Sequence, residues 1–205
     1  MNKLQTDVIY TDFSKAFDTV AHHLLLYKLD IMGFPSLFLK WISSYLQHRT
    51  QKVLFNEIFS MNITVTSGVP QGSHLGPVLF VLYLNDLPSA ITTSRVLMFA
   101  DDVKLFSNLN SPNQYIYLQN DLHSLANWCS FNSMSLNLKK CKKLSFFRTR
   151  HVSCNYSIGS YTLENVDSFF DLGVILDNRL RFHLHIEAFV NKANSLLIKR
   201  SRVPT

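Results

Sequence analysis

Two adjacent carboxylates, Asp101 and Asp102, constrain this chain more than any other feature of the sequence. They stand between two apolar segments, 96–100 and 103–106, whose residue types favour β-strands, so the pattern predicts a hairpin with the acidic pair at its tip. Like charges side by side repel each other, and carboxylates among apolar strands need a partner that neutralises them. Magnesium, which prefers oxygen ligands, would be such a partner. The competing interpretation is a solvated turn, because Asp favours turns for local reasons.

The composition limits the class of protein. The chain has 205 residues, 47% of them hydrophobic and 17% charged, so it is globular and long enough for one domain or one and a half. Its net charge of +6 favours a polyanionic partner. Its three cysteines, without CxxC spacing, argue for a reducing compartment and against a disulfide framework or a zinc knuckle.

The sequence lacks the signals of a secreted or membrane-bound protein. Its first seven residues have no apolar core of a signal peptide, and the longest apolar run, 78–84, is too short to span a bilayer. We therefore expect a soluble protein without a membrane partner, located inside the cell in the cytoplasm and nucleus.

Hydrophobic periodicity predicts helices that alternate with short strands. A strand over 7–13 reaches the carboxylate of Asp12, and helices follow over 22–32 and 35–48, the second with Trp41 as a buried anchor. Further strands are expected over 51–55, 62–66, 144–147, 156–158, 161–163 and 169–175, and further helices over 78–84, 113–131 and 183–200.

A loop over 67–77 differs from the rest of the chain, because it holds three of the six glycines and two of the six prolines. Glycine permits positive φ and close backbone approach, so this loop has a special shape and is expected to lie against a ligand. A tight connection between a strand and a helix is the alternative that the residues leave open.

Basic residues gather in two places. The densest run lies over 139–143 and continues to Arg148 and Arg150, and the last helix ends with Lys199 and Arg200, followed by Arg202. Such runs are commonly solvated surface, but they also suit contacts to a phosphate backbone, which are tolerant of sequence and weaken with salt.

Several segments, taken in chain order, resemble the motifs of a reverse transcriptase of the non-LTR (LINE-type, jockey-like) retrotransposon class. Residues 12–18 (DFSKAFD), 67–73 (SGVPQGS) and 99–102 (FADD) resemble motifs A, B and C. Trp128 with residues 137–142 (NLKKCK) resembles motif D, and residues 171–177 (DLGVILD) resemble the primer-grip segment. The resemblance covers nearly the whole chain.

The resemblance implies an α+β fold, a polymerase palm whose antiparallel sheet is backed by helices, with part of a thumb helix. Residues 1–178 would form the palm and residues 179–205 the start of the thumb. The implied function is RNA-directed DNA synthesis, in which dNTPs are added to a DNA primer on an RNA template by two-metal phosphoryl transfer. Asp12, Asp101 and Asp102 would be the catalytic residues and would hold two Mg²⁺ ions, or Mn²⁺.

The resemblance also assigns nucleotide-binding residues. Phe17 matches the family's bulky gate beneath the sugar, where a ring would clash with a 2′-hydroxyl; the competing interpretation is a phenylalanine that packs the core. Either Lys142 or Lys143 would supply the cation of motif D. The other positions assigned to the incoming nucleotide are Phe13, Gln71 and Gly72.

Template and primer would contact a second set of residues, and here the sequence also departs from the family. The contacts are expected at Lys139, Lys140, Arg148, Arg150 and Gly173. His74 and Ser133 depart from the pattern, the latter at a common turn glycine. The family's fingers precede motif A, and a full-length element carries an endonuclease, so we expect a palm-centred fragment. The alternative function is an inactive relic that keeps the palm fold and binds nucleic acid weakly.

Overall fold

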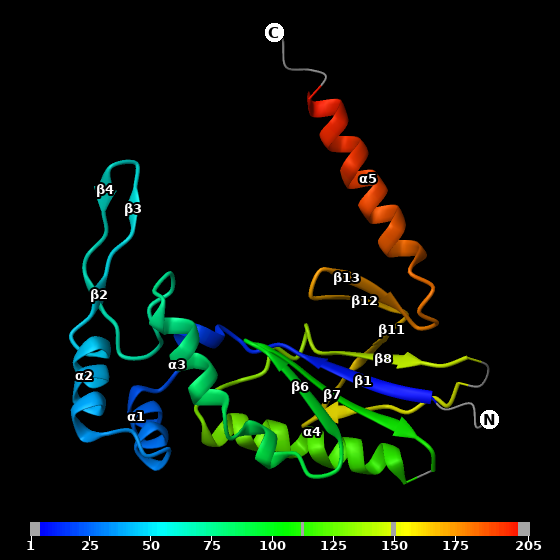
Figure 1. Ribbon diagram of the computed structural model, residues 1–205, viewed down its shortest axis with the longest axis horizontal. Coiled ribbons are helices and arrows are strands. Elements are labelled where there is room, and N and C mark those ends of the chain that lie inside the picture. Colours follow the sequence, from blue (N-terminus) through cyan, green and yellow to red (C-terminus); the bar gives the residue numbers. More distant parts are fainter. Residues whose placement is uncertain (1–4, 112, 149–150, 201–205) are drawn as a thin grey trace.

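A computed structural model of the chain describes residues 5–111, 113–148 and 151–200, with the backbone alone for 196–200. A five-stranded sheet lies at its centre, in the order β11-β8-β1-β7-β6 (Figure 1). β1 is antiparallel to both of its neighbours, and β11 is parallel to β8. The strands are β1 (Gln5–Thr11), β6 (Arg95–Phe99), β7 (Asp102–Leu109), β8 (Lys142–Phe146) and β11 (Glu164–Val166).

Helices and small strand pairs complete the fold. The helices are α1 (His22–Ile31), α2 (Ser36–Leu46), α3 (Leu75–Leu84), α4 (Gln114–Phe131) and α5 (His183–Arg200), with short 3₁₀ turns over Ala16–Asp18 and Leu87–Ala90. The small strands are β9 (Ser157–Ile158), β10 (Tyr161–Thr162), β12 (Ser168–Asp171) and β13 (Val174–Asp177). No helix in the described part of the chain has both the length and the apolarity to cross a bilayer.

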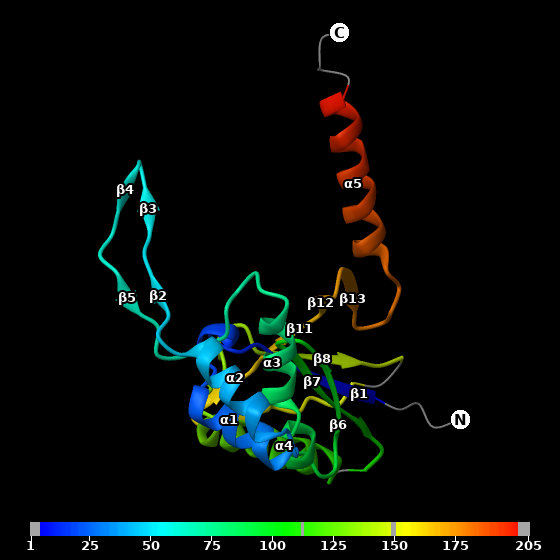
Figure 2. The same cartoon turned by 60° about the vertical axis from the view of Figure 1, so that its left-hand side comes forward.

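The two faces of β1 serve two different clusters, because side chains alternate along a strand. Ile9 points into the large core, to which Leu25 of α1, Phe80 of α3 and Leu122 of α4 contribute. Val8 and Tyr10 point to the opposite face, where the β12–β13 hairpin covers them (Figure 2). The expected α+β fold, with a mainly antiparallel sheet backed by helices, is confirmed.

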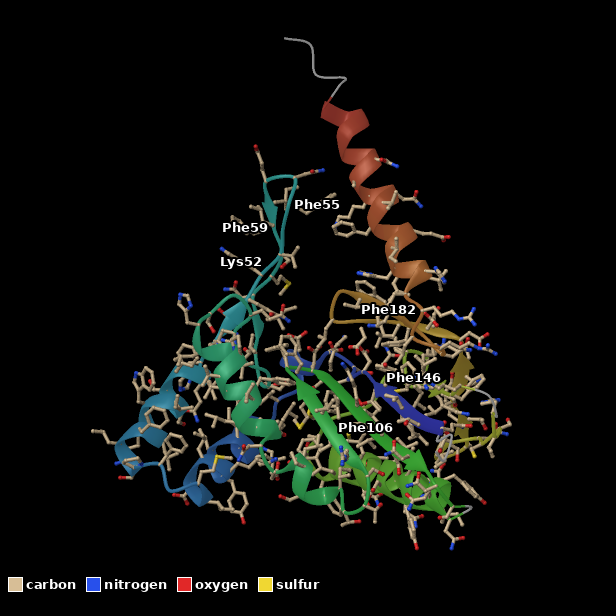
Figure 3. The ribbon with its side chains drawn as sticks, turned by 45° about the vertical axis from the view of Figure 1, so that its right-hand side comes forward. Lys52, Phe55, Phe59, Phe106, Phe146 and Phe182 are labelled. Atoms are coloured by element: carbon tan, nitrogen blue, oxygen red, sulfur yellow. The ribbon has the colours of Figure 1, made fainter. Side chains whose placement is uncertain are left out.

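Two elements extend away from this body, on the side of the β12–β13 hairpin (Figure 1). One is α5. The other is a long hairpin over 50–64, made of β2 (Thr50–Gln51) with β5 (Ile63–Thr64) and β3 (Leu54–Phe55) with β4 (Ile58–Phe59). Strands were expected over 51–55 and 62–66, but the pairing is interrupted. The side chains of this hairpin are exposed, including Phe55 and Phe59 (Figure 3).

Three other expectations need correction. The strand expected over 169–175 is the β12–β13 hairpin, because Leu172 and Gly173 both have positive φ (45° and 91°), as in a two-residue type I′ turn. Trp41 is not a buried anchor, since 51% of it is exposed and its ring lies against Phe38 and Tyr45 of the same helix. α3 begins at Leu75, before the Gly76-Pro77 pair, because proline fits the first turn of a helix.

Asp121 shows how a buried charge is accommodated in this fold. Its carboxylate lies on α4 and is 1% exposed, and it accepts hydrogen bonds from the backbone N–H groups of Thr92, Thr93 and Ser94 and from two threonine hydroxyls. Burial acts to raise its pKa, but these hydrogen bonds prevail and hold the pKa at about 2. The carboxylate therefore fixes the loop that leads into β6.

We predict that Asp121→Asn lowers the free energy of unfolding at pH 7 by about 2 kcal/mol, because an amide cannot accept from all of these donors. A depressed pKa stabilises the fold above the ordinary Asp pKa, and this contribution disappears as the pH falls through about 2. The gap between wild type and variant in urea melts should therefore close between pH 4 and pH 2. Asp30→Asn, at an exposed position on α1, is the control and should match wild type; an Asp121→Asn protein as stable as wild type at pH 7 would contradict the prediction.

Candidate active site

The register of β1 with β7 brings two of the predicted carboxylates together. Thr11 pairs with Val103, so the next residues, Asp12 and Asp102, lie across from each other at this end of the two strands. They share the sheet face of Tyr10 and Lys104, because residues two apart in a strand point the same way. All four residues line one groove of about 460 Å³.

Asp101 has a different place. It and Ala100 form the two-residue turn between β6 and β7, in which Ala100 has a φ of 51°, the sign that a type II′ turn has at its first central residue. Asp101 does not line the groove. Within the described ranges, no three side chains of the His, Cys, Asp or Glu type are grouped so that they could hold one metal ion.

The acidic side chains nevertheless influence one another. Partial burial raises the pKa of Asp102, and the charges of Asp101, Asp171 and Asp12 raise it further, whereas the charge of Lys104 lowers it. Asp12 is 28% exposed, but its Oδ2 atom is shielded from solvent and has no hydrogen-bond partner among the described residues. Lys140 Nζ lies 3.3 Å from this oxygen, at ion-pair distance but without hydrogen-bond alignment.

The basic run over 139–143 divides between the two sides of the sheet. Lys139, Lys140 and Lys142 line the groove, and Lys142 also donates to Glu164 at 2.5 Å. Lys143 pairs with Ile9 in the register of β8 with β1, so it points to the helical face, where it is 2% exposed and donates to the carbonyl of Cys154. Of the two motif D candidates, the structure therefore puts only Lys142 at the groove.

The other residues expected to contact nucleic acid are dispersed. Arg148 is exposed beyond the far end of β8, at the opposite end of that strand from Lys142. Gly173 is exposed in the turn of the β12–β13 hairpin. Arg150, Arg202 and the side chains of Lys199 and Arg200 lie outside the described residues.

The glycine-rich loop packs on the segment that follows Asp12. The backbone N–H of Gly68 donates to Val20 O and that of Val69 donates to Phe17 O, both at 2.8 Å. Gly68 has a φ of +85°, and a Cβ atom there would lie 2.8 Å from the backbone of Asp18. Only glycine adopts this positive φ easily and also fits against the Asp18 backbone without displacing it. The loop therefore takes its special shape from contact with the 3₁₀ turn over Ala16–Asp18.

The predicted nucleotide-binding residues receive different environments. Phe13 is 4% exposed and belongs to the large core, so its ring points away from the groove, contrary to a direct contact with a nucleotide. Phe17 is half-buried and stacks on Phe80, with ring centroids 4.5 Å apart. Gln71 and Gly72 are exposed, and Gln71 Nε2 donates to Asp18 Oδ1 at 2.9 Å.

Several groove residues were not assigned a role from the sequence, among them Tyr10, Lys104, Phe169 and Asp171. Tyr10 could have been found, because it lies two residues before Asp12 on an expected strand and so shares its face. Lys104 follows Asp102 by the same spacing. Phe169 and Asp171 come from the β12–β13 hairpin, and nothing local in the sequence indicates that this hairpin covers Tyr10.

Ser133 occupies the position where a turn glycine is common in the resemblance drawn above. It has a φ of 52°, so the backbone keeps the left-handed conformation that glycine adopts most easily. The departure therefore leaves the turn after α4 in place, at the cost of some local strain.

Comparison with known proteins gives a consistent result. The family model described as reverse transcriptase (RNA-dependent DNA polymerase) matches residues 2–176. The RNA-directed DNA polymerases from the mobile element jockey are 29% identical in Drosophila funebris, over 95% of this chain, and 30% identical in Drosophila melanogaster, over 86%. The solved structure of apo telomerase from Candida tropicalis superposes on 87% of this chain with a TM-score of 0.56 and 12% identity.

The chain is much shorter than these proteins. It spans 23% of the length of the Drosophila funebris polymerase and 20% of the Drosophila melanogaster one, and it covers 35% of the telomerase chain. The likeness to telomerase, at 12% identity, concerns the fold alone.

We predict that Gly68→Ala destabilises the protein by at least about 2 kcal/mol more than Gly33→Ala. Both glycines have a φ of +85°, but a Cβ at Gly33 would meet nothing within 4 Å. Gly33→Ala is therefore the control, and it measures only the cost of a left-handed backbone at a residue with a Cβ atom. This cost is about 1–2 kcal/mol, less the stabilisation that alanine gives by reducing the entropy of the unfolded chain. Urea melts of the two variants measure the difference, and equal losses would show that the loop does not need its close approach to Asp18.

Proposed function

This chain belongs to the reverse transcriptase family, and we propose that it is the palm of an RNA-directed DNA polymerase from a non-LTR retrotransposon. In this proposal it adds deoxynucleotides from dNTPs to a DNA primer paired with an RNA template. The observation that carries the proposal is the pair of carboxylates, Asp12 and Asp102, that face each other in a groove lined by Lys139, Lys140 and Lys142. Residues 1–178 form the palm, and α5 begins a thumb.

The carboxylates fit a divalent cation. Asp12 Oδ2 is shielded from solvent and lacks a hydrogen-bond partner among the described residues. Burial and the neighbouring acidic side chains both raise the pKa of Asp102. Asp12 and Asp102 would hold Mg²⁺ or Mn²⁺, with Asp101 beside them in the turn. When bound, two such ions supply activation of the primer 3′-oxygen and charge neutralisation at the leaving phosphates. Oxygen ligands of this kind are those that Mg²⁺ prefers.

The chain's own residues orient the reactants. The three groove lysines place positive charge beside the carboxylates, where phosphates of the nucleotide and primer have to lie. Gln71 and Gly72 present an exposed loop whose position is held by Gly68 against the segment after Asp12. Phe17, restrained by its stack on Phe80, acts as the gate that excludes a 2′-hydroxyl.

Primer extension tests the function directly. We expect the 205-residue chain, with an oligo(dT) primer on a poly(rA) template, to incorporate dTTP only when Mg²⁺ or Mn²⁺ is present. Asp12→Asn should abolish incorporation, whereas Asp30→Asn on α1 should not change it. Incorporation that persists in Asp12→Asn would overturn the assignment of this carboxylate.

Thermal melts test the metal site without activity. Ten millimolar Mg²⁺ should stabilise wild type by about 1.4 kcal/mol if its Kd is about 1 mM, because a ligand of the folded state adds RT ln(1 + [L]/Kd). Without metal, Asp102→Asn should be neutral or stabilising, since it removes one of the crowded charges. The same variant should lose most of the Mg²⁺ response. A wild-type melting temperature that does not respond to Mg²⁺ would count against the site.

Salt dependence tests the nucleic-acid surface. Lys139→Ala and Lys140→Ala should weaken binding of an RNA–DNA duplex uniformly across sequences, and each should reduce the slope of log K against log salt by about one, because phosphate contacts release counterions. Arg148→Ala, at the other end of β8, removes the same charge away from the groove and is the matched control. Equal effects of all three variants would indicate a diffuse basic surface instead of a binding groove.

A further inference from the structure

The β12–β13 hairpin is held on the sheet by side chains and, at its open end, by the backbone: one residue, Asp167, links it to β11, and the N–H of Phe147 donates to Asn178 O at 3.2 Å. Its two strands pair with each other and form a separate two-stranded sheet, without a backbone ladder to the five-stranded one. A two-stranded hairpin by itself is at best marginally stable. Beyond this open end, the position of the hairpin over the groove therefore depends on what its side chains contact below.

An aromatic stack provides one of these contacts. Phe169 of β12 lies on Tyr10 of β1, with ring centroids 3.9 Å apart and an interplanar angle of 19°. Phe106 and Phe146, both labelled in Figure 3, belong to the same cluster, together with Leu176 of β13. Apolar contact of this kind keeps the hairpin near the sheet but tolerates sliding, because it has little directional preference.

An ion pair provides the directional contact. Lys104 of β7 pairs with Asp171 of β12, and the two side chains are only 12% and 14% exposed. It is the one ion pair that joins the hairpin to the five-stranded sheet within the residues that the structure describes. Lys104 Nζ also lies 5.8 Å from the centroid of the Tyr10 ring. A shielded pair has one favourable geometry, and removal of either partner leaves an unpaired buried charge.

The charge of Lys104 also acts on a second carboxylate, that of Asp102. Lys104 follows Asp102 by two residues on the same face of β7, and its positive charge lowers the pKa of Asp102. Asp171 thus holds a cation that would otherwise be free to neutralise Asp102. Loss of Asp171 and loss of Lys104 should for this reason have different consequences at the carboxylates, although each breaks the same pair.

We propose that Lys104 and Asp171 are positioning residues whose ion pair latches the β12–β13 hairpin over the groove and keeps the Lys104 ammonium from pairing with Asp102. The latch fixes Phe169 and Phe170 as part of the groove lining. The role of the latch in catalysis rests on the proposed function, because the groove is where primer and nucleotide would meet. The docking of the hairpin itself does not depend on that function.

Hydrogen exchange tests the docking. In peptide-resolved mass spectrometry, Lys104→Met and Asp171→Asn should each speed amide exchange over 168–177 at least tenfold, with peptides of β1 unchanged. Lys104→Arg should keep wild-type protection, and the apolar double variant Lys104→Met/Asp171→Leu should regain it, since replacement of both charges leaves none unpaired. Glu164→Gln, which breaks the more exposed pair with Lys142, is the control and should not change the exchange. Wild-type exchange in both single variants would overturn the latch.

Magnesium response tests the second half of the proposal. From melts across a Mg²⁺ titration, Asp171→Asn should lower the apparent affinity at least threefold, because Lys104 is released toward Asp102. Lys104→Met loosens the same hairpin but removes the competing cation, so its affinity should equal or exceed that of wild type. An equal fall in both variants would show that only the hairpin's position matters and would overturn the role assigned to Asp171. If wild type shows no Mg²⁺ response at all, the proposed function fails, and the exchange result still decides the latch.

Discussion

The antiparallel pairing of β1 with β7 is the constraint on which the rest of the structure depends. Its register sets Asp12 across from Asp102, and the alternation of the two strands sends Ile9 and Leu105 into the helical core while Tyr10 and Lys104 face the groove. A shift of one residue would exchange these two sets, burying charges and exposing core side chains. The large core therefore stabilises the position of the carboxylates, because no other register satisfies both faces.

The charges of the groove are arranged in pairs of opposite sign, which is how crowded carboxylates can coexist in the folded chain. Lys140 lies beside Asp12, and Lys104 pairs with Asp171 while its charge also acts on Asp102. Each lysine reduces repulsion in the absence of metal, yet neither completes the hydrogen bonding of Asp12 Oδ2. Such an arrangement is stable enough to fold and leaves carboxylate oxygens accessible, since an exposed lysine such as Lys140 can be displaced at small cost.

Much of this could be predicted from the sequence, and the failures have physical causes. The strand before Asp12, the hairpin at Asp101 and Asp102, and the helices α1, α2 and α4 follow from local periodicity and turn residues. The burial of Lys143 and of the Phe13 ring could not be read from the basic run or the motif, since it depends on which sheet face each residue occupies. The exposure of Trp41 and the docking of the β12–β13 hairpin likewise depend on parts of the chain that are distant in sequence. Local sequence patterns carry no information about such contacts.

The central place of β1 has a consequence for how the chain folds during synthesis. β1 precedes both of its sheet neighbours along the chain, and Ile9 pairs with Leu105 on one side and with Lys143 on the other. Contacts so distant along the chain form slowly, because the entropy cost of closing a long loop comes before either strand pairing contributes favourable free energy. The sheet around β1 is therefore completed only after β8 has left the ribosome. Both edges of β1 remain open until β7 has been made, and the edge toward β8 stays open longer, which is the condition under which nascent chains associate with each other or with chaperones.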